Sequence, residues 1–182
     1  MEISAHPRPR VRDAFRFHRP SHRARSLSDI SEQELCALGI RAALLDMDNT
    51  LSTWRGRSLA PDASDLVARL SQAGLALAVF SNNQPRNVTA LAEQLGIEVA
   101  IARAGKPNRR AFIKAAQRMN LPPSACAVIG DQLMTDIVGA RRAGFGAAIL
   151  VRPLTRREWV FTKFNRFWEA VILRISGQRQ NK

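Results

Sequence analysis

The sequence has few cysteines and histidines, and it lacks any long apolar run. Its two cysteines, Cys36 and Cys126, are interpreted as reduced core residues rather than as a disulfide or a metal site. The three histidines (His6, His18 and His22) lie near the N-terminus without another ligand type nearby, which argues against zinc binding. No apolar stretch approaches the length of a membrane-spanning helix, and residues 1–25 lack the apolar core of a secretory signal.

Acidic residues are also scarce relative to basic ones. The chain has 28 Lys and Arg residues against 15 Asp and Glu residues, which gives a formal net charge of +13. The excess is concentrated at the ends: +4 in residues 1–30 and +6 in residues 151–182, but only +3 in residues 31–150. A basic surface attracts nucleic acid, anionic lipid or phosphorylated substrates. Solvated charge without any partner explains the same composition.

The remaining sequence divides into a tail and an ordered region. Residues 1–26 are rich in Pro, Arg, His and Ser and have little periodicity, so we predict a basic tail that stays mobile or wraps the surface. Ser31 and Glu34 form a capping box, which predicts a short helix that ends at Gly39.

Apolar runs of strand length then alternate with helical patterns. The predicted strands are 40–46, 75–80, 98–102, 125–129 and 147–151, and the predicted helices are 61–73, 85–95, 108–119 and 133–143.

This alternation predicts an α/β domain over residues 27–153. Continuous apolar strands between amphipathic helices are typical of a Rossmann-like parallel sheet with helices on both faces, in three layers. In such sheets ligands bind at the carboxyl ends of the strands. The candidate functional residues should therefore follow the predicted strands, and they do.

The first predicted strand ends in two carboxylates, Asp46 and Asp48. Two acids this close repel each other, and a divalent cation with a preference for hard oxygen ligands, such as Mg²⁺, relieves that repulsion. One aspartate can also act as a nucleophile while its neighbour donates a proton to the leaving group. An Asx-turn after a strand is the structural alternative.

Three further segments place polar residues after a strand or before a helix. Ser81 and Asn82 precede a predicted helix whose free N–H groups suit phosphate oxygens, although a turn explains them equally well. Lys106 offers a point charge for a phosphate, or is an ordinary surface lysine. Asp131 follows a strand and Asp136 lies one turn later, which suits metal ligation or N-capping.

The four segments, taken in order, resemble the signature motifs of the haloacid-dehalogenase-like (HAD) superfamily. Motif one is Asp-x-Asp-x-Thr at 46–50, motif two is Ser81, motif three is Lys106 and motif four is Gly-Asp-x₄-Asp at 130–136. The Asp-Met-Asp-Asn-Thr-Leu, Ser-Asn-Asn, Gly-Lys-Pro and Gly-Asp-Gln-Leu-Met-Thr-Asp segments resemble its class IIIA, YqeG-like branch, which is related to phosphatidylglycerophosphatases. The likeness covers roughly residues 20–175.

The resemblance implies roles for the residues that match. Asp46 would be the nucleophile that forms an aspartyl-phosphate. Asp48 would be the general acid and then the base that activates water. Ser81, Lys106 and the backbone near Asn82 would hold the phosphoryl oxygens.

The resemblance also implies a Mg²⁺ site. Asp46, the backbone carbonyl of Asp48 and Asp131 would be its ligands. Asp136 would support the metal through water or a hydrogen bond, and Thr50 would help to shape the loop. The presence of Asp48 favours a phosphatase over a dehalogenase.

Many members of this superfamily carry a cap domain over the active site. Here about 30 residues separate Asp48 from Ser81 and 25 separate Ser81 from Lys106, which leaves room for one helix plus connections in each gap. We therefore predict a capless enzyme with an open site that suits bulky substrates.

An apolar stripe predicts an amphipathic helix over residues 154–176, which either packs on the domain or lies at a membrane surface. The stripe consists of Val160, Phe164, Phe167, Trp168, Val171 and Ile175.

Three functions compete on these observations. The first is dephosphorylation of phosphatidylglycerophosphate, at the inner face of the membrane of a cytoplasmic, peripherally attached enzyme. The second is a phosphatase for a soluble or macromolecular phosphate, such as a nucleic-acid end or a phosphoprotein. The third is a basic protein that binds RNA or the ribosome on a HAD scaffold, against which the complete set of acidic motifs argues.

Overall fold

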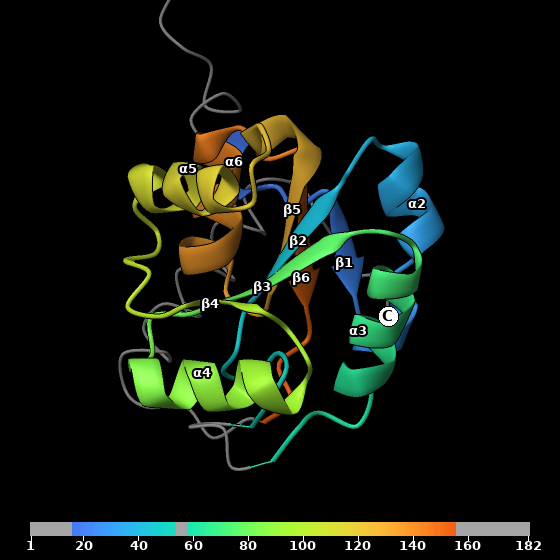
Figure 1. The fold of residues 1–182 in the computed structure, drawn as a ribbon. Coiled ribbons are helices and arrows are strands. Elements are labelled where there is room, and N and C mark those ends of the chain that lie inside the picture. Colours follow the sequence, from blue (N-terminus) through green and yellow to red (C-terminus); the bar gives the residue numbers. More distant parts are fainter. Residues whose placement is uncertain (1–15, 54–57, 156–182) are drawn as a thin grey trace, which may run out of the picture.

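The computed structural model describes residues 16–53 and 58–155 and contains one parallel sheet. The sheet has six strands in the order β1-β6-β5-β2-β3-β4, and every neighbouring pair is parallel (Figure 1). The strands are β1 (His22–Ala24), β2 (Ala42–Leu45), β3 (Ala76–Phe80), β4 (Val99–Ile101), β5 (Cys126–Gly130) and β6 (Ala147–Val151). All six carboxyl ends therefore lie at one edge of the sheet, where the site was expected.

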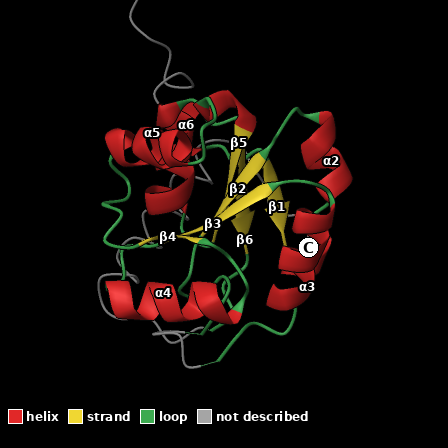
Figure 2. Cartoon of the chain, in the orientation of Figure 1, coloured by secondary structure: helices red, strands yellow, loops and turns green. Residues whose placement is uncertain are grey.

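Helices connect the strands (Figure 2). The α-helices are α2 (Glu32–Ala37), α3 (Ala63–Gln72), α4 (Pro85–Gln94), α5 (Arg109–Arg118) and α6 (Val138–Ala143), with short 3₁₀ turns η1 (Arg16–His18), η2 (Leu27–Asp29) and η4 (Pro123–Ala125). The expected cap is present at α2, where the Ser31 hydroxyl accepts a hydrogen bond from the backbone N–H of Glu34 at 3.1 Å. Elements predicted from periodicity and punctuation thus form within a few residues of the expected positions.

The predicted helix 133–143 is divided into two parts. Residues Leu133–Ile137 form a π-helical turn, η5, before α6 begins at Val138. The Ile137 N–H reaches back five residues to the carbonyl of Gln132 at 3.4 Å, whereas the Asp136 N–H bonds the same carbonyl at 3.0 Å. Such π turns are rare and often occur at functional sites. This one lies where Asp136 enters the site.

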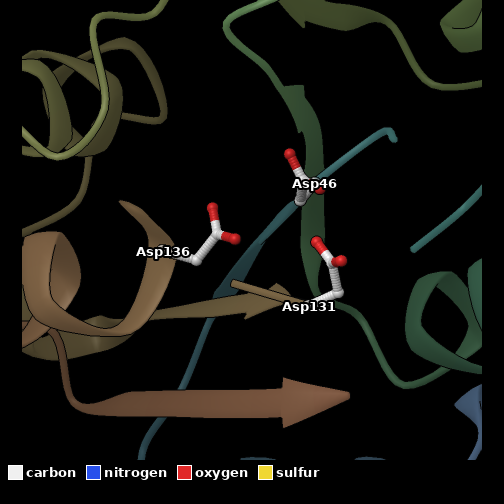
Figure 3. A group of neighbouring side chains, drawn as sticks. All are labelled: Asp46, Asp131 and Asp136. Carbon is white, nitrogen blue, oxygen red and sulfur yellow. The ribbon is translucent and has the colours of Figure 1, made fainter. Parts of the chain in front are cut away.

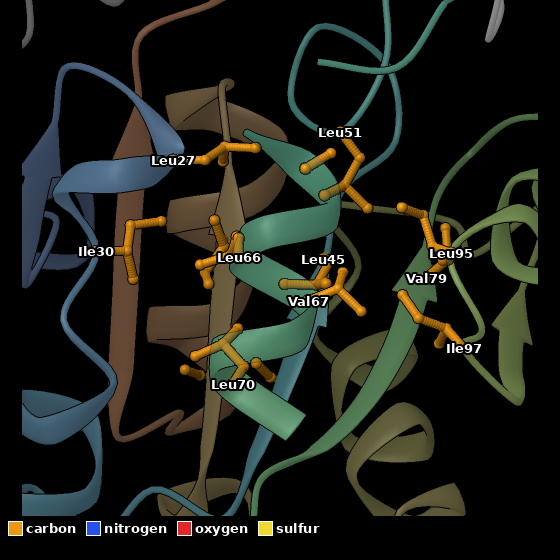
Figure 4. Packing of buried hydrophobic residues seen from close by; sticks show 14 of the residues in the cluster. Leu27, Ile30, Leu45, Leu51, Leu66, Val67, Leu70, Val79, Leu95 and Ile97 are labelled. Atoms are coloured by element: carbon orange, nitrogen blue, oxygen red, sulfur yellow. The ribbon is translucent and has the colours of Figure 1, made fainter. Parts of the chain in front are cut away.

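Two apolar cores cover the two faces of the sheet and confirm the three-layer prediction. Side chains alternate along a strand, so Leu45 of β2 and Val79 of β3 point to the same face and belong to one core with residues of α2, α3 and α4 (Figure 4). Their neighbours Leu44 and Phe80 face the opposite way, toward α5, η5 and α6. The sheet is buried on both sides, which holds its carboxyl edge in a fixed geometry.

The two cysteines differ in burial. Cys126 of β5 is buried, as expected of a small core residue, whereas Cys36 of α2 is exposed, and both are free thiols. The interpretation as core residues is therefore right for Cys126 and wrong for Cys36. A single position in a short helix does not reveal from sequence which side of that helix faces the core.

Part of the segment that we assigned to the tail belongs to the sheet. Strand β1 pairs with β6, and the Ser21 hydroxyl accepts a hydrogen bond from the Ala148 N–H at 3.0 Å. In β1 only Ala24 is buried, while His22 and Arg23 are exposed. A three-residue edge strand with one small buried side chain has no periodic apolar signal. Ordered structure therefore begins earlier than the capping box.

The two gaps between the motifs contain no added domain. The segment from Ser81 to Lys106 holds α4 and β4, and the segment from Asp48 to Ser81 holds α3 and β3, with only residues 54–57 outside the described part. Among the described helices, none is long and apolar enough to cross a membrane. The predicted helix 154–176, like residues 1–15 with His6, lies almost wholly outside the described residues.

Candidate active site

The site is built on the two central strands of the sheet. Asp46 directly follows β2 and Asp131 directly follows β5, and these strands are neighbours. The backbone N–H of Asp46 continues the ladder by donating to the carbonyl of Ile129 at 2.8 Å. Asp136 approaches from η5, so three carboxylates converge on one volume although their motifs are far apart in sequence (Figure 3).

Lys106 lies between two of these carboxylates. Its Nζ is 2.5 Å from Asp46 Oδ1 and 2.6 Å from Asp136 Oδ1, and it lies 5.4 Å from the centre of the Phe80 ring. Only 7% of Lys106 is exposed. A lysine in this position is a fixed ammonium in a dry environment, where its charge acts strongly on nearby groups. The structure thus excludes the ordinary surface lysine that the sequence left open.

Burial and charge act against each other on these groups. Burial raises the pKa of Asp46 to about 7, with the Asp136 carboxylate adding to that rise and the Lys106 ammonium opposing it. Burial also acts to lower the pKa of Lys106, but the Asp136 and Asp46 carboxylates outweigh it and raise the pKa above its usual value. Lys106 therefore stays protonated, while Asp46 changes its charge near neutrality in the protein without metal.

The carboxylate cluster fits a divalent cation. Asp46, Asp131 and Asp136 are buried, and one oxygen of each lies within 4.8 Å of the others. The lone buried cation of the described residues, Lys106, leaves this group with two formal negative charges. Hard oxygen ligands with this charge suit Mg²⁺.

Asp136 is already engaged by the protein. Its Oδ1 accepts a hydrogen bond from Lys106, and its Oδ2 accepts one from the backbone N–H of Gln132 at 3.1 Å. Gly130 makes room for this carboxylate, because a Cβ atom at residue 130 would lie 2.5 Å from Asp136 Cγ. Both carboxylate oxygens of Asp136 therefore already accept hydrogen bonds from the protein.

Asp48 is held by a residue that the sequence reasoning missed. Asn83 Nδ2 donates a hydrogen bond to Asp48 Oδ2 at 2.9 Å. The Asn83 Oδ1 in turn accepts hydrogen bonds from Asn87 Nδ2 at 2.9 Å and from the backbone N–H of Gln84 at 2.7 Å. The only sequence signal was a second asparagine in Ser-Asn-Asn, which a turn also explains. Asn83 fixes the orientation of the Asp48 carboxylate.

Asn82, whose backbone was expected to hold phosphoryl oxygens, makes a further contact through its side chain. Its side-chain amide forms two hydrogen bonds with the main chain of Lys106: Nδ2 donates to the Lys106 carbonyl at 3.0 Å, and Oδ1 accepts from the Lys106 N–H at 2.8 Å. Asn82 thereby fixes the loop that carries the lysine. Ser81 is buried, and its hydroxyl accepts a hydrogen bond from the Asn83 N–H at 3.1 Å.

Thr50 contacts the central carboxylate directly. Its hydroxyl donates to Asp46 Oδ2 at 3.3 Å, while Lys106 occupies Oδ1. The sequence implied only that Thr50 shapes the loop. The two donors together set the direction in which the Asp46 carboxylate points.

A pocket of about 570 Å³ opens at this edge of the sheet. It brings together five of the predicted residues, Asp46, Asp48, Ser81, Asn82 and Lys106. The other lining residues, which sequence reasoning did not select, are Asn83, Gln84, Arg86, Asn87, Gln132 and Thr135. Arg86 and Asn87 lie in the first turn of α4, so this helix directs its N-terminal end and one arginine toward the pocket.

Comparison with known proteins agrees with the architecture and the motifs. The family model of haloacid dehalogenase-like hydrolases matches residues 53–144. A probable phosphatase of Bacillus subtilis, YqeG, is 34% identical over 158 residues, which cover 87% of this chain and 91% of the relative. The chain belongs to the haloacid dehalogenase-like hydrolase family, and the predicted enzyme class, a phosphatase of that family, is confirmed.

Solved structures share the fold. The cobalt-bound deoxy-D-mannose-octulosonate 8-phosphate phosphatase of Haemophilus influenzae aligns with a TM-score of 0.52 at 16% identity, over 80% of this chain and 93% of that one. A 3-deoxy-D-manno-octulosonate 8-phosphate phosphatase of Moraxella catarrhalis, solved with magnesium, phosphate and the sugar acid, aligns with a TM-score of 0.50 at 21% identity, over 79% and 92%. These likenesses confirm the predicted α/β fold.

The contact between Asn83 and Asp48 gives a first prediction. Asn83→Ala should lower kcat/KM, which reports only the steps up to release of the alcohol, about 10- to 100-fold on an alkyl phosphate, since it removes a group that orients Asp48, the expected proton donor. The loss on p-nitrophenyl phosphate should be much smaller, because its leaving group departs without a proton. Asn82→Ala serves as the control, and we expect equal losses on both esters there. Equal losses in Asn83→Ala would contradict the role of Asn83.

The raised pKa of Asp46 gives a second prediction. At pH 6 the metal-free protein holds Asp46 largely protonated, so Mg²⁺ binding should release about one proton; at pH 8 it should release almost none. Calorimetric titration with Mg²⁺ in two buffers of different ionisation enthalpy measures this difference. The affinity for Mg²⁺ should fall about tenfold for each pH unit below 7. Proton release that is the same at both pH values would refute the prediction.

Proposed function

We propose that this enzyme is a Mg²⁺-dependent phosphate monoester hydrolase that forms an aspartyl-phosphate on Asp46. The observation that carries the proposal is the placement of Asp46 at the end of β2. Lys106 and Thr50 contact one carboxylate oxygen each, and Asp131, directly after β5, lies beside Asp46. A carboxylate oriented in this way can attack phosphorus in line with the leaving oxygen.

Two steps follow from the residues present. In the first, an Asp46 oxygen attacks the phosphorus, the ester P–O bond breaks, and the Asp48 carboxyl group gives its proton to the leaving alcohol. In the second, the Asp48 carboxylate takes a proton from a water molecule that attacks the aspartyl-phosphate, which releases inorganic phosphate and restores Asp46. Asn83 keeps Asp48 in position for both transfers.

The charge that develops on the phosphoryl oxygens needs fixed donors. Lys106 supplies an ammonium beside Asp46, and we propose that the Ser81 hydroxyl and the backbone at Asn82 provide further donors from the same pocket. Asp46, the backbone carbonyl of Asp48 and Asp131 would hold Mg²⁺, with Asp136 in support. When bound, the cation neutralises phosphoryl charge and brings substrate and nucleophile together.

We propose phosphatidylglycerophosphate as the substrate, with phosphatidylglycerol and phosphate as products. The described residues contain no cap over the pocket, so a phosphate carried on a bulky lipid can reach Asp46. The basic ends of the sequence and the predicted amphipathic segment 154–176 support work at an anionic membrane surface. The enzyme would then act at the inner face of the membrane, attached peripherally.

The test offers three classes of phosphate to the purified full-length protein with Mg²⁺. These are phosphatidylglycerophosphate in mixed micelles, p-nitrophenyl phosphate, and oligonucleotides with a 3′- or 5′-phosphate. We expect the lipid to have the highest kcat/KM and Asp46→Asn to hydrolyse none of the three. Turnover of the small ester without the lipid would exclude the lipid as substrate. Preference for the oligonucleotide would establish a macromolecular phosphatase instead.

A further inference from the structure

Exposed arginines lie on both sides of the active site at the carboxyl edge of the sheet. Arg25 directly follows β1 and Arg152 directly follows β6, at one side of the central strands. Arg86, in the first turn of the helix after β3, and Arg103, two residues after β4, lie at the other side. Along the strand order, the edge therefore carries two arginines, then the acidic centre, then two arginines.

Hydrogen bonds fix the backbone of two of these arginines at the edge. The Arg152 N–H donates to the carbonyl of Ala24 at 3.0 Å, which places Arg152 beside Arg25. The Arg103 N–H donates to the carbonyl of Asn83 at 3.0 Å, directly next to motif two. Arg86 lines the pocket itself. All four arginines are exposed, so their guanidinium groups can meet a partner outside the molecule.

Acidic residues offset these charges only in part. Asp29 and Asp62 lie near Arg25; Asp29 accepts hydrogen bonds from the N–H groups of Arg25 and Ser26, and Asp62 accepts one from the Ser28 hydroxyl. On the opposite side, no acidic residue occurs between residues 99 and 130 of the sequence. The rim around the pocket is thus positive, in contrast to the buried carboxylates at its centre.

An exposed apolar side chain, Leu154, lies near two of these arginines. Leu154, 38% exposed, is one of two exposed large hydrophobic residues among those described, and it lines a smaller pocket with Arg25 and Arg152. Its N–H donates to the Asn49 carbonyl at 3.1 Å, and the Thr155 hydroxyl donates to Asn49 Oδ1 at 2.7 Å. Leu154 and Thr155, the first two residues of the predicted helix 154–176, are therefore held at this edge.

We propose that this arginine rim, defined as Arg25, Arg86, Arg103 and Arg152, docks the active-site edge on an anionic lipid bilayer. The proposal rests on the proposed lipid substrate. It adds which surface of the enzyme contacts the membrane and that the active-site edge faces the bilayer. Six strands spaced by about 4.8 Å span roughly 24 Å, which is wide enough to contact several head groups. Guanidinium groups bind lipid phosphates in pairs of hydrogen bonds, and the pocket between them faces a phosphomonoester that projects from the surface.

The same charges would attract nucleic acid, but the apolar group favours lipid. Among the described residues no phenylalanine, tyrosine or tryptophan ring is exposed on which a base can stack, whereas Leu154 lies beside Arg152, where a bilayer boundary accepts an apolar side chain. Docking edge-on also keeps the substrate in its membrane during hydrolysis.

The test measures binding of the full-length protein to vesicles by flotation. Vesicles of phosphatidylcholine with about 30 mol % phosphatidylglycerol, enough for a strong surface potential, are compared with pure phosphatidylcholine. The edge variant carries Arg25→Gln, Arg103→Gln and Arg152→Gln, and leaves the pocket residue Arg86 in place. The matched control carries Arg41→Gln, Arg118→Gln and Arg142→Gln, three exposed arginines away from this edge.

Each arginine near an anionic surface strengthens binding about fivefold, so we expect the edge variant to bind on the order of 100-fold more weakly. The control variant should bind anionic vesicles as strongly as the parent. Both variants should hydrolyse p-nitrophenyl phosphate at the parental rate, and only the edge variant should lose turnover of vesicle-borne lipid. Binding of the parent should also weaken between about 0.1 and 1 M salt, since the screening length falls from about 10 to 3 Å.

Equal binding of the two variants would overturn the docking proposal. So would a result in which the edge variant loses affinity for an oligonucleotide duplex but not for vesicles. These outcomes can be distinguished from a failure of the proposed function, because binding to vesicles and hydrolysis of lipid are measured separately. Asp46→Asn should still float with anionic vesicles, and a protein that binds through the arginine rim yet hydrolyses no lipid would contradict only the substrate assignment.

Discussion

Asp46→Asn is expected to lower kcat on every phosphate monoester by about 10⁴-fold or more, the scale found when a nucleophile is removed. The amide is nearly the same size as the carboxylate but cannot form a stable bond to phosphorus. Steady-state assays with p-nitrophenyl phosphate and Mg²⁺ measure the effect. Asp65→Asn is a matched control, because Asp65 forms an exposed ion pair with Arg69 on α3 and does not line the pocket.

The same variant should remain folded and, at pH 8, unfold at higher denaturant than the parent in Mg²⁺-free buffer. The folded state raises the pKa of Asp46 from 3.8 to about 7, so the parent loses stability as the pH rises through that window and Asp46 ionises. The neutral amide of the variant does not ionise and carries no such cost. The difference should shrink at pH 5, where Asp46 is mostly protonated. Residual turnover near the parental rate would instead disprove Asp46 as nucleophile.

Lys106→Met is expected to lower the free energy of unfolding by about 3–5 kcal/mol in Mg²⁺-free buffer, the usual cost of leaving a buried charge without its partner. Lys106 contacts both Asp46 and Asp136, and its removal leaves the buried carboxylates without a compensating cation. Chemical denaturation at pH 8 measures the loss. Turnover should also fall by at least about 100-fold, since a fixed donor beside the phosphoryl group is lost.

A second substitution separates charge from packing. Adding Asp136→Asn to Lys106→Met should restore much of the lost stability, because one of the repelling carboxylates disappears. Saturating Mg²⁺ should also restore it. Lys114→Met, at an exposed position of α5, should change stability by no more than about 0.5 kcal/mol. A Lys106→Met protein as stable as Lys114→Met would show that the observed ion pairs contribute nothing.

Local signals were sufficient for most of the fold. The capping box at Ser31 and the prolines and glycines at helix ends predicted elements that the structure contains, because they act on neighbouring residues. The fully buried strands β2 and β5 had continuous apolar sequences, as expected of a parallel sheet. Asp46, Asp131 and Lys106 were selected for the same reason, since each follows or precedes a recognisable element.

Other features had no local signal. Strand β1 exists because Ala24 packs against the sheet and the β6 backbone needs a partner, and neither cause appears within residues 22–24. Asn83 was passed over because its partner, Asp48, is 35 residues away. The Asn82 side chain bonds the main chain of a residue 24 positions later, a contact that no local pattern predicts.

The sequence by itself determined the α/β class, the family and the set of acidic and basic residues that we propose to carry the chemistry. These follow from periodicity, turn chemistry and the order of short motifs, all of which are local. The tertiary structure decided that Lys106 joins Asp46, 60 residues away, to Asp136, and that four arginines lie along the same edge of the sheet, two on each side of these residues. Such contacts depend on strand order and on the common direction of parallel strands, which bring distant residues together only when the sheet is complete.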